Sequence, residues 1–181
     1  MEEFIAESTS RLKLRKLANK IKDKFNLQGN LYLDVLRLLE LICVVIPDTN
    51  YEIVPDDTFP PHIHGDTDII KKEIRIKESV YDGAVNGNGR DRMTVAHEIA
   101  HLLLLGGMFD IKLQRNFKKD EVLPYRSPEW QAKCFAAELL IPADLTKDMT
   151  PKEIAQKCGV SKAAANYQYN VNRNLKKKGI L

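Results

Sequence analysis

The sequence predicts an α+β fold that is mostly helical and contains a small mixed sheet. Two observations lead to this prediction. Apolar residues recur at helical spacing in both halves of the 181-residue chain, whereas short alternating segments gather in residues 48–89. Helices and strands do not alternate regularly, as a parallel βαβ sheet would require. The length is typical of one main hydrophobic core with at most a small appendage.

The chain is expected to begin with two amphipathic helices. The apolar spacing predicts the first over residues 5–26, and Gly29 lies in the short polar segment that ends it. A second helix is predicted over residues 31–42. Residues 43–46 are rich in β-branched side chains, so we expect the helix to change to a strand there, before Pro47.

The segment 48–89 is expected to form short strands and loops. Tyr51–Val54 and Glu73–Lys77 are the strand candidates, and in the second of them apolar and charged residues alternate. Asn86–Gly89 consists of two Asn-Gly pairs, which is a strong signal for a turn.

Two further helices are predicted on either side of an irregular segment. The first covers Asp91–Leu105 and is followed by Gly106, a residue typical of helix C-termini. The second begins after Ser127, a good N-cap, and ends before Pro142. Residues 108–126 between them have weak periodicity and are expected to form irregular surface chain.

The last part of the chain predicts two short helices joined by a tight turn. Thr150 and Glu153 form a capping-box pattern, and Ser161 is the expected N-cap of the final helix. This arrangement is typical of a helix-turn-helix. We therefore expect a main domain over residues 1–146, which includes the N-terminal amphipathic helix, and a basic helical tail over residues 147–181.

The formal net charge of +3 hides two basic ends and an acidic middle. Residues 1–24 carry seven Lys/Arg against four Asp/Glu, and residues 147–181 carry eight against two. A basic end can contact nucleic acid or simply be a well-solvated helix. The final helix has three consecutive alanines and only Lys162 and Arg173 as basic residues before Lys176. A hairpin packed on the rest of the chain is therefore the preferred interpretation, and direct nucleic-acid binding is the alternative.

Cysteine usage and hydropathy exclude two classes of protein. Cys43, Cys134 and Cys158 are too few and too scattered for a disulfide framework, which indicates reduced thiols in a cytosol. The start of the chain is acidic and lacks the pattern of a secretory signal. The longest apolar run, Leu41–Ile46, is far shorter than the roughly 20 residues that a membrane helix needs. We expect a cytoplasmic protein without membrane contact.

The segment with the clearest chemistry is His97-Glu98-Ile99-Ala100-His101, inside a predicted helix. His97 and His101 are four residues apart, so both imidazoles lie on one helix face and can share one zinc ion. Glu98 can reach a water bound to that metal and act as general base. The flanking residues are apolar, and two buried imidazoles without partners are costly. The sequence therefore predicts one zinc site per chain rather than two histidines of the core, although manganese suits the same ligands.

A hydrolytic zinc site takes three protein ligands and leaves a fourth position for water. Glu129 is the candidate third ligand, because it lies in the first turn of the next predicted helix, which can return across the metal helix. The helix dipole also favours a carboxylate at that position, which is the structural alternative. Glu138 is the competing ligand. As a lone acid in an apolar stretch, it is expected instead to support a histidine or to cap a buried polar group.

Three segments together resemble the ImmA/IrrE family of metallopeptidases. They are residues 89–94 (GRDRMT), residues 97–105 (HEIAHLLLL) and the E-x-x-A-x-x-F-A-A-E-L-L-I-P pattern of residues 129–142. The resemblance is specific over residues 73–142. It implies a zincin-like fold whose active-site helix carries HEIAH. By position, it implies His97, His101 and Glu129 as zinc ligands and Glu98 as general base.

The resemblance also implies a role. Some members of the family cleave a helix-turn-helix repressor encoded by a mobile element, a phage or a stress regulon, so a DNA-binding repressor is the expected protein substrate. The alternative is a regulator without proteolytic activity, which acts by sequestering a repressor or by binding DNA through its tail. Tyr125, His62 and His64 are candidates for stabilising the oxyanion. By analogy with zincin-like folds, Glu73–Lys77 is the candidate edge strand for an extended substrate.

Overall fold

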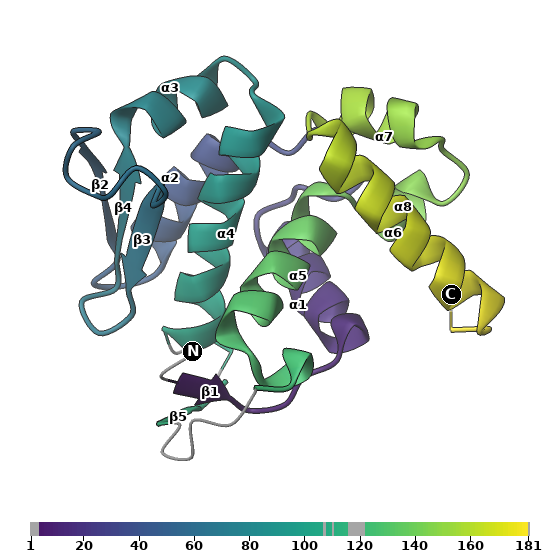
Figure 1. The fold of residues 1–181 in the computed structure, drawn as a ribbon, viewed down its shortest axis with the longest axis horizontal. Coiled ribbons are helices and arrows are strands. Elements are labelled where there is room, and N and C mark those ends of the chain that lie inside the picture. Colours follow the sequence, from purple (N-terminus) through teal and green to yellow (C-terminus); the bar gives the residue numbers. More distant parts are fainter. Residues whose placement is uncertain (1–3, 107, 110, 116–121, 181) are drawn as a thin grey trace.

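The computed structural model describes residues 4–106, 108–109, 111–115 and 122–180, and it is a mixed, mostly helical fold with two small sheets (Figure 1). The predicted α+β class is confirmed at this level. In chain order the elements are β1 (Phe4–Ala6), α1 (Arg11–Lys24), α2 (Val35–Val45), β2 (Asn50–Val54), β3 (Gly65–Asp68), β4 (Glu73–Lys77), α3 (Glu78–Val85), α4 (Gly89–Leu105), β5 (Leu113–Arg115), the 3-10 helix η1 (Pro124–Arg126), α5 (Pro128–Leu140), α6 (Ala143–Thr146), α7 (Pro151–Cys158) and α8 (Lys162–Lys177).

The first helix begins later than its periodicity predicts. Ser10 caps α1 by accepting a hydrogen bond from the backbone N–H of Lys13. Ahead of this cap the chain is extended, and β1 pairs antiparallel with β5, more than a hundred residues away. The prediction of a helix from residue 5 is therefore wrong at its start, because a distant strand partner takes the backbone hydrogen bonds there. Residues 110 and 116–121 of the predicted irregular segment lie outside the described residues.

The predicted strand at residues 43–46 is also wrong, because α2 continues to Val45. Asp34 caps this helix, and Ile46 N–H still donates to the carbonyl of Ile42 at 2.8 Å. β-Branched residues reduce helix stability by only a few tenths of a kcal/mol each. The full burial of Leu38 and Ile42 in the core outweighs that small cost.

The main sheet has three strands in the order β2-β4-β3, with β2 parallel and β3 antiparallel to β4. The two strands predicted in this region are present, and the alternation in β4 places Ile74 and Ile76 in the core. Helix α3 follows β4 directly and was not predicted. β4 is the central strand, so the expectation that residues 73–77 form a free edge is wrong. The edge strands of this sheet are β2 and β3.

Helix α4 passes through the middle of the molecule, between the three-stranded sheet and the helices α1 and α5 (Figure 1). Its apolar residues Val95, Ile99 and Leu103 are completely buried, as are Phe135 and Leu140 of α5. Burial of this kind contributes about 25 cal/mol per Å² of apolar surface, which makes the α4–α5 contact a rigid centre of the core.

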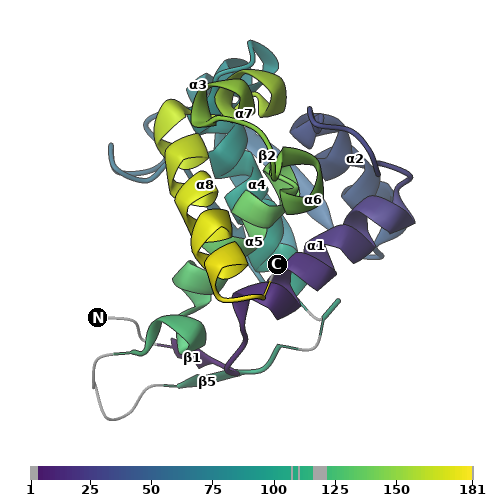
Figure 2. The same cartoon turned by 90° about the vertical axis from the view of Figure 1, so that its right-hand side faces the viewer.

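The tail forms the predicted hairpin, in which α8 lies beside α5 (Figure 2). The capping box of Thr150 and Glu153 is present, and Ser161 caps α8. Gly159 ends α7 with a φ of 62°, and a Cβ there would lie 2.5 Å from the ring of Tyr32. A Cβ on Gly89 would lie 2.4 Å from the carbonyl carbon of Val160. The turn between α7 and α8 is therefore packed tightly against the start of α4.

Within the described part of the chain, no helix is both long enough and apolar enough to cross a membrane.

Candidate metal centre

Helix α4 carries His97, Glu98 and His101, and its first residue is defined by an N-cap. Asn88 accepts a hydrogen bond from the backbone N–H of Arg90, and Asp91 lies in the first turn, where a negative charge is favourable. The buried side of the helix faces the core. The two histidines, four residues apart, lie on the other side and are partly exposed.

Helix α5 brings Glu129 to the same place. Ser127 caps it by accepting from Trp130 N–H, and Pro128 occupies the first turn, as the sequence predicts. The side-chain amide of Gln131 donates to the carbonyls of Glu7 and Tyr125, each at 2.9 Å. These bonds tie the first turn of α5, which carries Glu129, to the chain segments around it.

The three predicted ligands form a compact triangle. His97 Nε2 and His101 Nε2 lie 3.1 Å apart, and they lie 3.3 and 3.1 Å from the two carboxylate oxygens of Glu129. Two atoms that bind one tetrahedral zinc at 2.0–2.1 Å are separated by about 3.3 Å. The spacing and the donor set therefore fit a metal ion such as zinc. Hydrogen bonds from His101 and His97 hold the pKa of Glu129 well below its usual range, so its carboxylate is ionised, as a ligand must be.

Glu98 lies beside this triangle and is almost completely buried. The hydroxyl of Thr67, on β3, donates to Glu98 Oε2 at 2.7 Å. Burial raises the pKa of Glu98, and the hydrogen bond from Thr67 opposes that shift. β3 approaches closely here, because a Cβ on Gly65 would lie 3.3 Å from Glu98 Cγ. The carboxylate is thus held in one orientation by the edge strand of the sheet.

Thr67 was not found from the sequence. The segment Gly65–Asp68 has no apolar alternation, and no local pattern connects it with a residue 31 positions later. The structure alone identifies it, by placing a short polar edge strand beside the helix that carries Glu98.

A cleft of about 1200 Å³ contains the triangle and Glu98. Its walls are formed by α4, by α5 and by the first turns of α8. Residues 62–67, which include most of β3, line another side. His62 and His64 line this cleft, and His64 Nε2 lies 3.1 Å from a guanidinium nitrogen of Arg90. Tyr125 is not among the described lining residues, and its carbonyl is bound by Gln131 and by Thr9 N–H.

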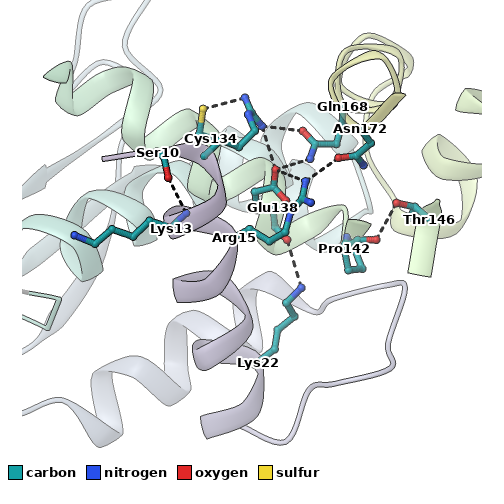
Figure 3. Close-up of polar contacts among 11 residues, drawn as sticks. Ser10, Lys13, Arg15, Lys22, Cys134, Glu138, Pro142, Thr146, Gln168 and Asn172 are labelled. Carbon is teal, nitrogen blue, oxygen red and sulfur yellow. Dashed lines mark hydrogen bonds and ion pairs between the residues drawn. The ribbon is translucent and has the colours of Figure 1, made fainter. Parts of the chain in front are cut away.

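Glu138 is not part of the triangle. Its side chain has no exposed surface and binds Arg11, Arg15 and Gln168 (Figure 3). Among the described residues, the only group of ligands that can hold a metal consists of the three predicted residues and excludes Glu138. Glu138 was expected either to support a histidine or to cap a buried polar group, and its contacts agree with the second role.

Of the comparisons with known proteins, the match to a family model bears on the chemistry of the site. Residues 84–170 match the model of the Peptidase_M78 family, described as the IrrE N-terminal-like domain. This match confirms the resemblance over residues 84–142 and continues to residue 170, beyond the expected domain boundary at residue 146. A solved structure titled "Mycobacterium tuberculosis transcriptional regulator" is similar over 87% of this chain and 46% of its own, with 15% identity and a TM-score of 0.57. The chain thus spans about half of that protein, and the likeness concerns the fold alone. No curated protein matches the chain.

Proposed function

We propose that this chain is a zinc-dependent endopeptidase, because residues 84–170 match the model of the IrrE N-terminal-like domain. The observation that carries the proposal is the triangle of His97, His101 and Glu129, whose ligand atoms all lie within 4.8 Å of one another. A structural zinc site has no need of Glu98, a buried carboxylate beside the first ligand. Its presence in the same cleft supports a hydrolytic site.

Each residue has a role in this proposal. His97, His101 and Glu129 hold the metal, and zinc bound there supplies Lewis acidity for the peptide carbonyl and acidifies water. Glu98 accepts the proton of the attacking water at its carboxylate and passes it to the leaving nitrogen. His62 and His64 are the candidates for stabilising the oxyanion, because both line the cleft.

An extended peptide can pair with the edge strand β3, whereas β4 is the central strand of its sheet. Among the residues that the structure describes, β3 pairs with a strand on one side only, and the hydroxyl of its Thr67 donates to the proposed general base, Glu98. A peptide added to this edge forms backbone hydrogen bonds that do not depend on its sequence. We propose that this edge aligns the scissile bond with the triangle.

The substrate we propose is a helix-turn-helix repressor, as the family resemblance implies, cleaved in the cytoplasm. The three cysteines are free, which suits a reducing compartment. We propose that the tail, residues 147–181, is a helical unit that supports the cleft and does not bind DNA. Its turn is covered by Tyr32 and by Arg92, whose guanidinium donates to the carbonyl of Gly159.

The test combines metal content with activity. Wild type, His97→Ala, Glu129→Ala and Glu98→Gln are purified without chelator and analysed by mass spectrometry for zinc and manganese. We expect one zinc per chain in wild type and in Glu98→Gln, and none in the two ligand variants. Only wild type should cleave a repressor encoded beside it.

Two results would overturn the proposal. If Glu98→Gln released transcription as well as wild type does, the chain would act by sequestering the repressor without cleavage. If none of the four proteins took up metal on titration, the histidines would be residues of the core.

A further inference from the structure

Among the described residues that line the cleft, the cations outnumber the acids that remain available to pair with them. Among the described lining residues, the acids Glu98 and Glu129 belong to the proposed metal centre, and Asp66 is bound by the guanidinium of Arg75. The lining cations, in contrast, are distributed over three elements. They are Arg11 of α1, Arg90 of α4 and Lys133 of α5.

Arg11 is the most firmly held of these cations. Its Nη1 donates to the carboxylate of Glu138 at 3.2 Å and to Gln168 Oε1 at 3.1 Å, and its Nη2 lies 2.9 Å from Cys134 Sγ. Only 12% of its side chain is exposed, and it is exposed to the cleft. A guanidinium fixed in this way loses little conformational entropy when it binds a ligand.

The group behind Arg11 has more positive than negative charge. Arg15 binds the same carboxylate, with its Nε 2.6 Å from Glu138 Oε2, and its Nη1 has no partner among the described residues (Figure 3). One carboxylate therefore faces two guanidinium groups, both largely removed from water. A second carboxylate at the cleft side of Arg11 would balance this charge where the low dielectric makes the attraction strong.

The tail supplies the rest of this subsite. Ala163, Ala164 and Tyr167 of α8 line the cleft, and the ring of Tyr167 lies 5.8 Å from the Arg11 guanidinium carbon. Two alanines leave room for a substrate side chain, and the tyrosine ring forms one wall. Lys133, one turn after Glu129, is exposed on the adjacent side of the cleft.

We propose that Arg11, Ala163, Ala164 and Tyr167 form a specificity subsite that binds an acidic side chain of the peptide substrate. The proposal rests on the proposed peptidase function only for the identity of the ligand as a peptide. Arg11 is the residue that selects the carboxylate, and α8 closes the subsite. The cleft thus prefers substrate segments with a glutamate or aspartate a few residues from the scissile bond.

Peptide pairs test this subsite in the zinc-loaded full chain. Quenched fluorescent decapeptides carry one Glu or one Gln, scanned through every position on both sides of a central Leu–Ala bond in an Ala/Ser background. We expect kcat/KM to be higher for Glu than for Gln at one position by about tenfold, because a hydrogen bond to a charged group is stronger than one to a neutral group. Equal rates at all positions would overturn the proposal.

A matched pair of variants assigns the preference. Arg11→Met should remove the discrimination, whereas Arg15→Met, which removes the second guanidinium of the same ion cluster but lies outside the cleft, should weaken it without abolishing it. Circular dichroism checks that both variants fold. If Arg11→Met does not fold, the comparison of Glu and Gln peptides with the wild-type protein still tests the subsite. Added salt should then reduce the preference for Glu. Loss of discrimination in Arg15→Met alone would contradict the role of Arg11.

A binding measurement separates this proposal from the peptidase function. Fluorescein-labelled forms of the same peptides are titrated with the Glu98→Gln protein and followed by anisotropy. Tighter binding of the Glu peptide, without cleavage by wild type, would support the subsite and refute the peptidase. Cleavage without any preference for Glu would support the peptidase and refute the subsite.

Discussion

At the scale of single residues, Thr67 is the support of the proposed general base. Its hydroxyl is within 2.7 Å of Glu98 Oε2 and also lies 3.2 Å from the carbonyl oxygen of Glu98. A carboxylate in a buried position keeps its orientation only if a donor fixes it. Thr67 is therefore a positioning residue, which touches Glu98 and not the metal triangle.

Replacing Thr67 by Val, which has the same shape without the hydroxyl, should lower kcat by about tenfold or more. A hydrogen bond to a charged group contributes about 1.5–3 kcal/mol. Zinc content should stay at the wild-type level, and KM should change little. Thr67→Ser restores the donor and should restore most of kcat. Steady-state kinetics with zinc analysis measures both, and an unchanged kcat in Thr67→Val would refute this role.

Lys22 is a buried lysine whose ammonium group donates to a backbone carbonyl. It is 6% exposed, and its Nζ donates to the carbonyl of Glu138 at 3.3 Å. The normal helical partner of that carbonyl is residue 142, a proline without an N–H. Burial lowers the pKa of Lys22 below its usual value of 10.5, against the attraction of Asp144 and Glu138.

The lowered pKa predicts how stability changes with pH. Between the folded pKa of Lys22 and 10.5, the unfolded chain binds more protons than the folded one, so stability rises with pH in that window. Lys22→Met lacks this contribution. The stability of wild type relative to Lys22→Met should therefore increase from neutral to alkaline pH, as measured by urea unfolding. A constant difference over that range would contradict the shift.

At the scale of elements, the buried cluster around Glu138 joins three helices. Arg11 and Arg15 come from α1, Glu138 from α5, and Gln168 from α8 (Figure 3). Such a cluster contributes little net stability compared with an apolar contact. It does define how α8 lies on α5, because the carboxylate is bound from two sides.

Removing the charge of Glu138 should be costly, because two buried guanidinium groups lose their counter-ion. We expect Glu138→Gln to lower the free energy of unfolding by about 3 kcal/mol or more. Glu153→Gln, which changes the exposed capping box of α7, is the matched control and should lower the free energy of unfolding far less. Urea unfolding compares the two, and similar small losses would show that the cluster does not secure α8.

At the scale of the whole molecule, the proposed metal joins α4 to α5, the two helices at the centre of the core. A ligand that binds only the folded state stabilises it by RT ln(1 + [L]/Kd), about 2.7 kcal/mol at a hundredfold excess over Kd. Metal content and global stability are therefore coupled.

Chelation should lower the Tm of wild type and of Glu98→Gln to a similar extent. His97→Ala lacks a ligand and should show little change with chelator. Differential scanning fluorimetry with EDTA, followed by added zinc, measures the effect. A Tm of wild type that did not respond to either would refute a metal site between α4 and α5.

Much of this molecule follows from local sequence. The caps at Ser127, Thr150 and Ser161, and the helices that they begin, were predicted correctly because a cap acts within one turn of its own helix. The spacing of His97 and His101 places both on one face for the same local reason. The position of Glu129 in the first turn of the next predicted helix made it the candidate third ligand, and the family resemblance implied the same residue.

The tertiary structure decided what depends on partners distant in the chain. It placed β1 against β5 and β4 at the centre of its sheet, and it kept residues 43–45 helical. It also brought Thr67 to Glu98, and Arg11 to a cleft walled by α8. Strand pairing and burial are non-local contacts, and short-range periodicity carries no information about which distant segment provides them. Three residues of the proposed site thus lie on one helix, α4, whereas its third ligand, its support and its proposed selectivity depend on how the rest of the chain packs around that helix.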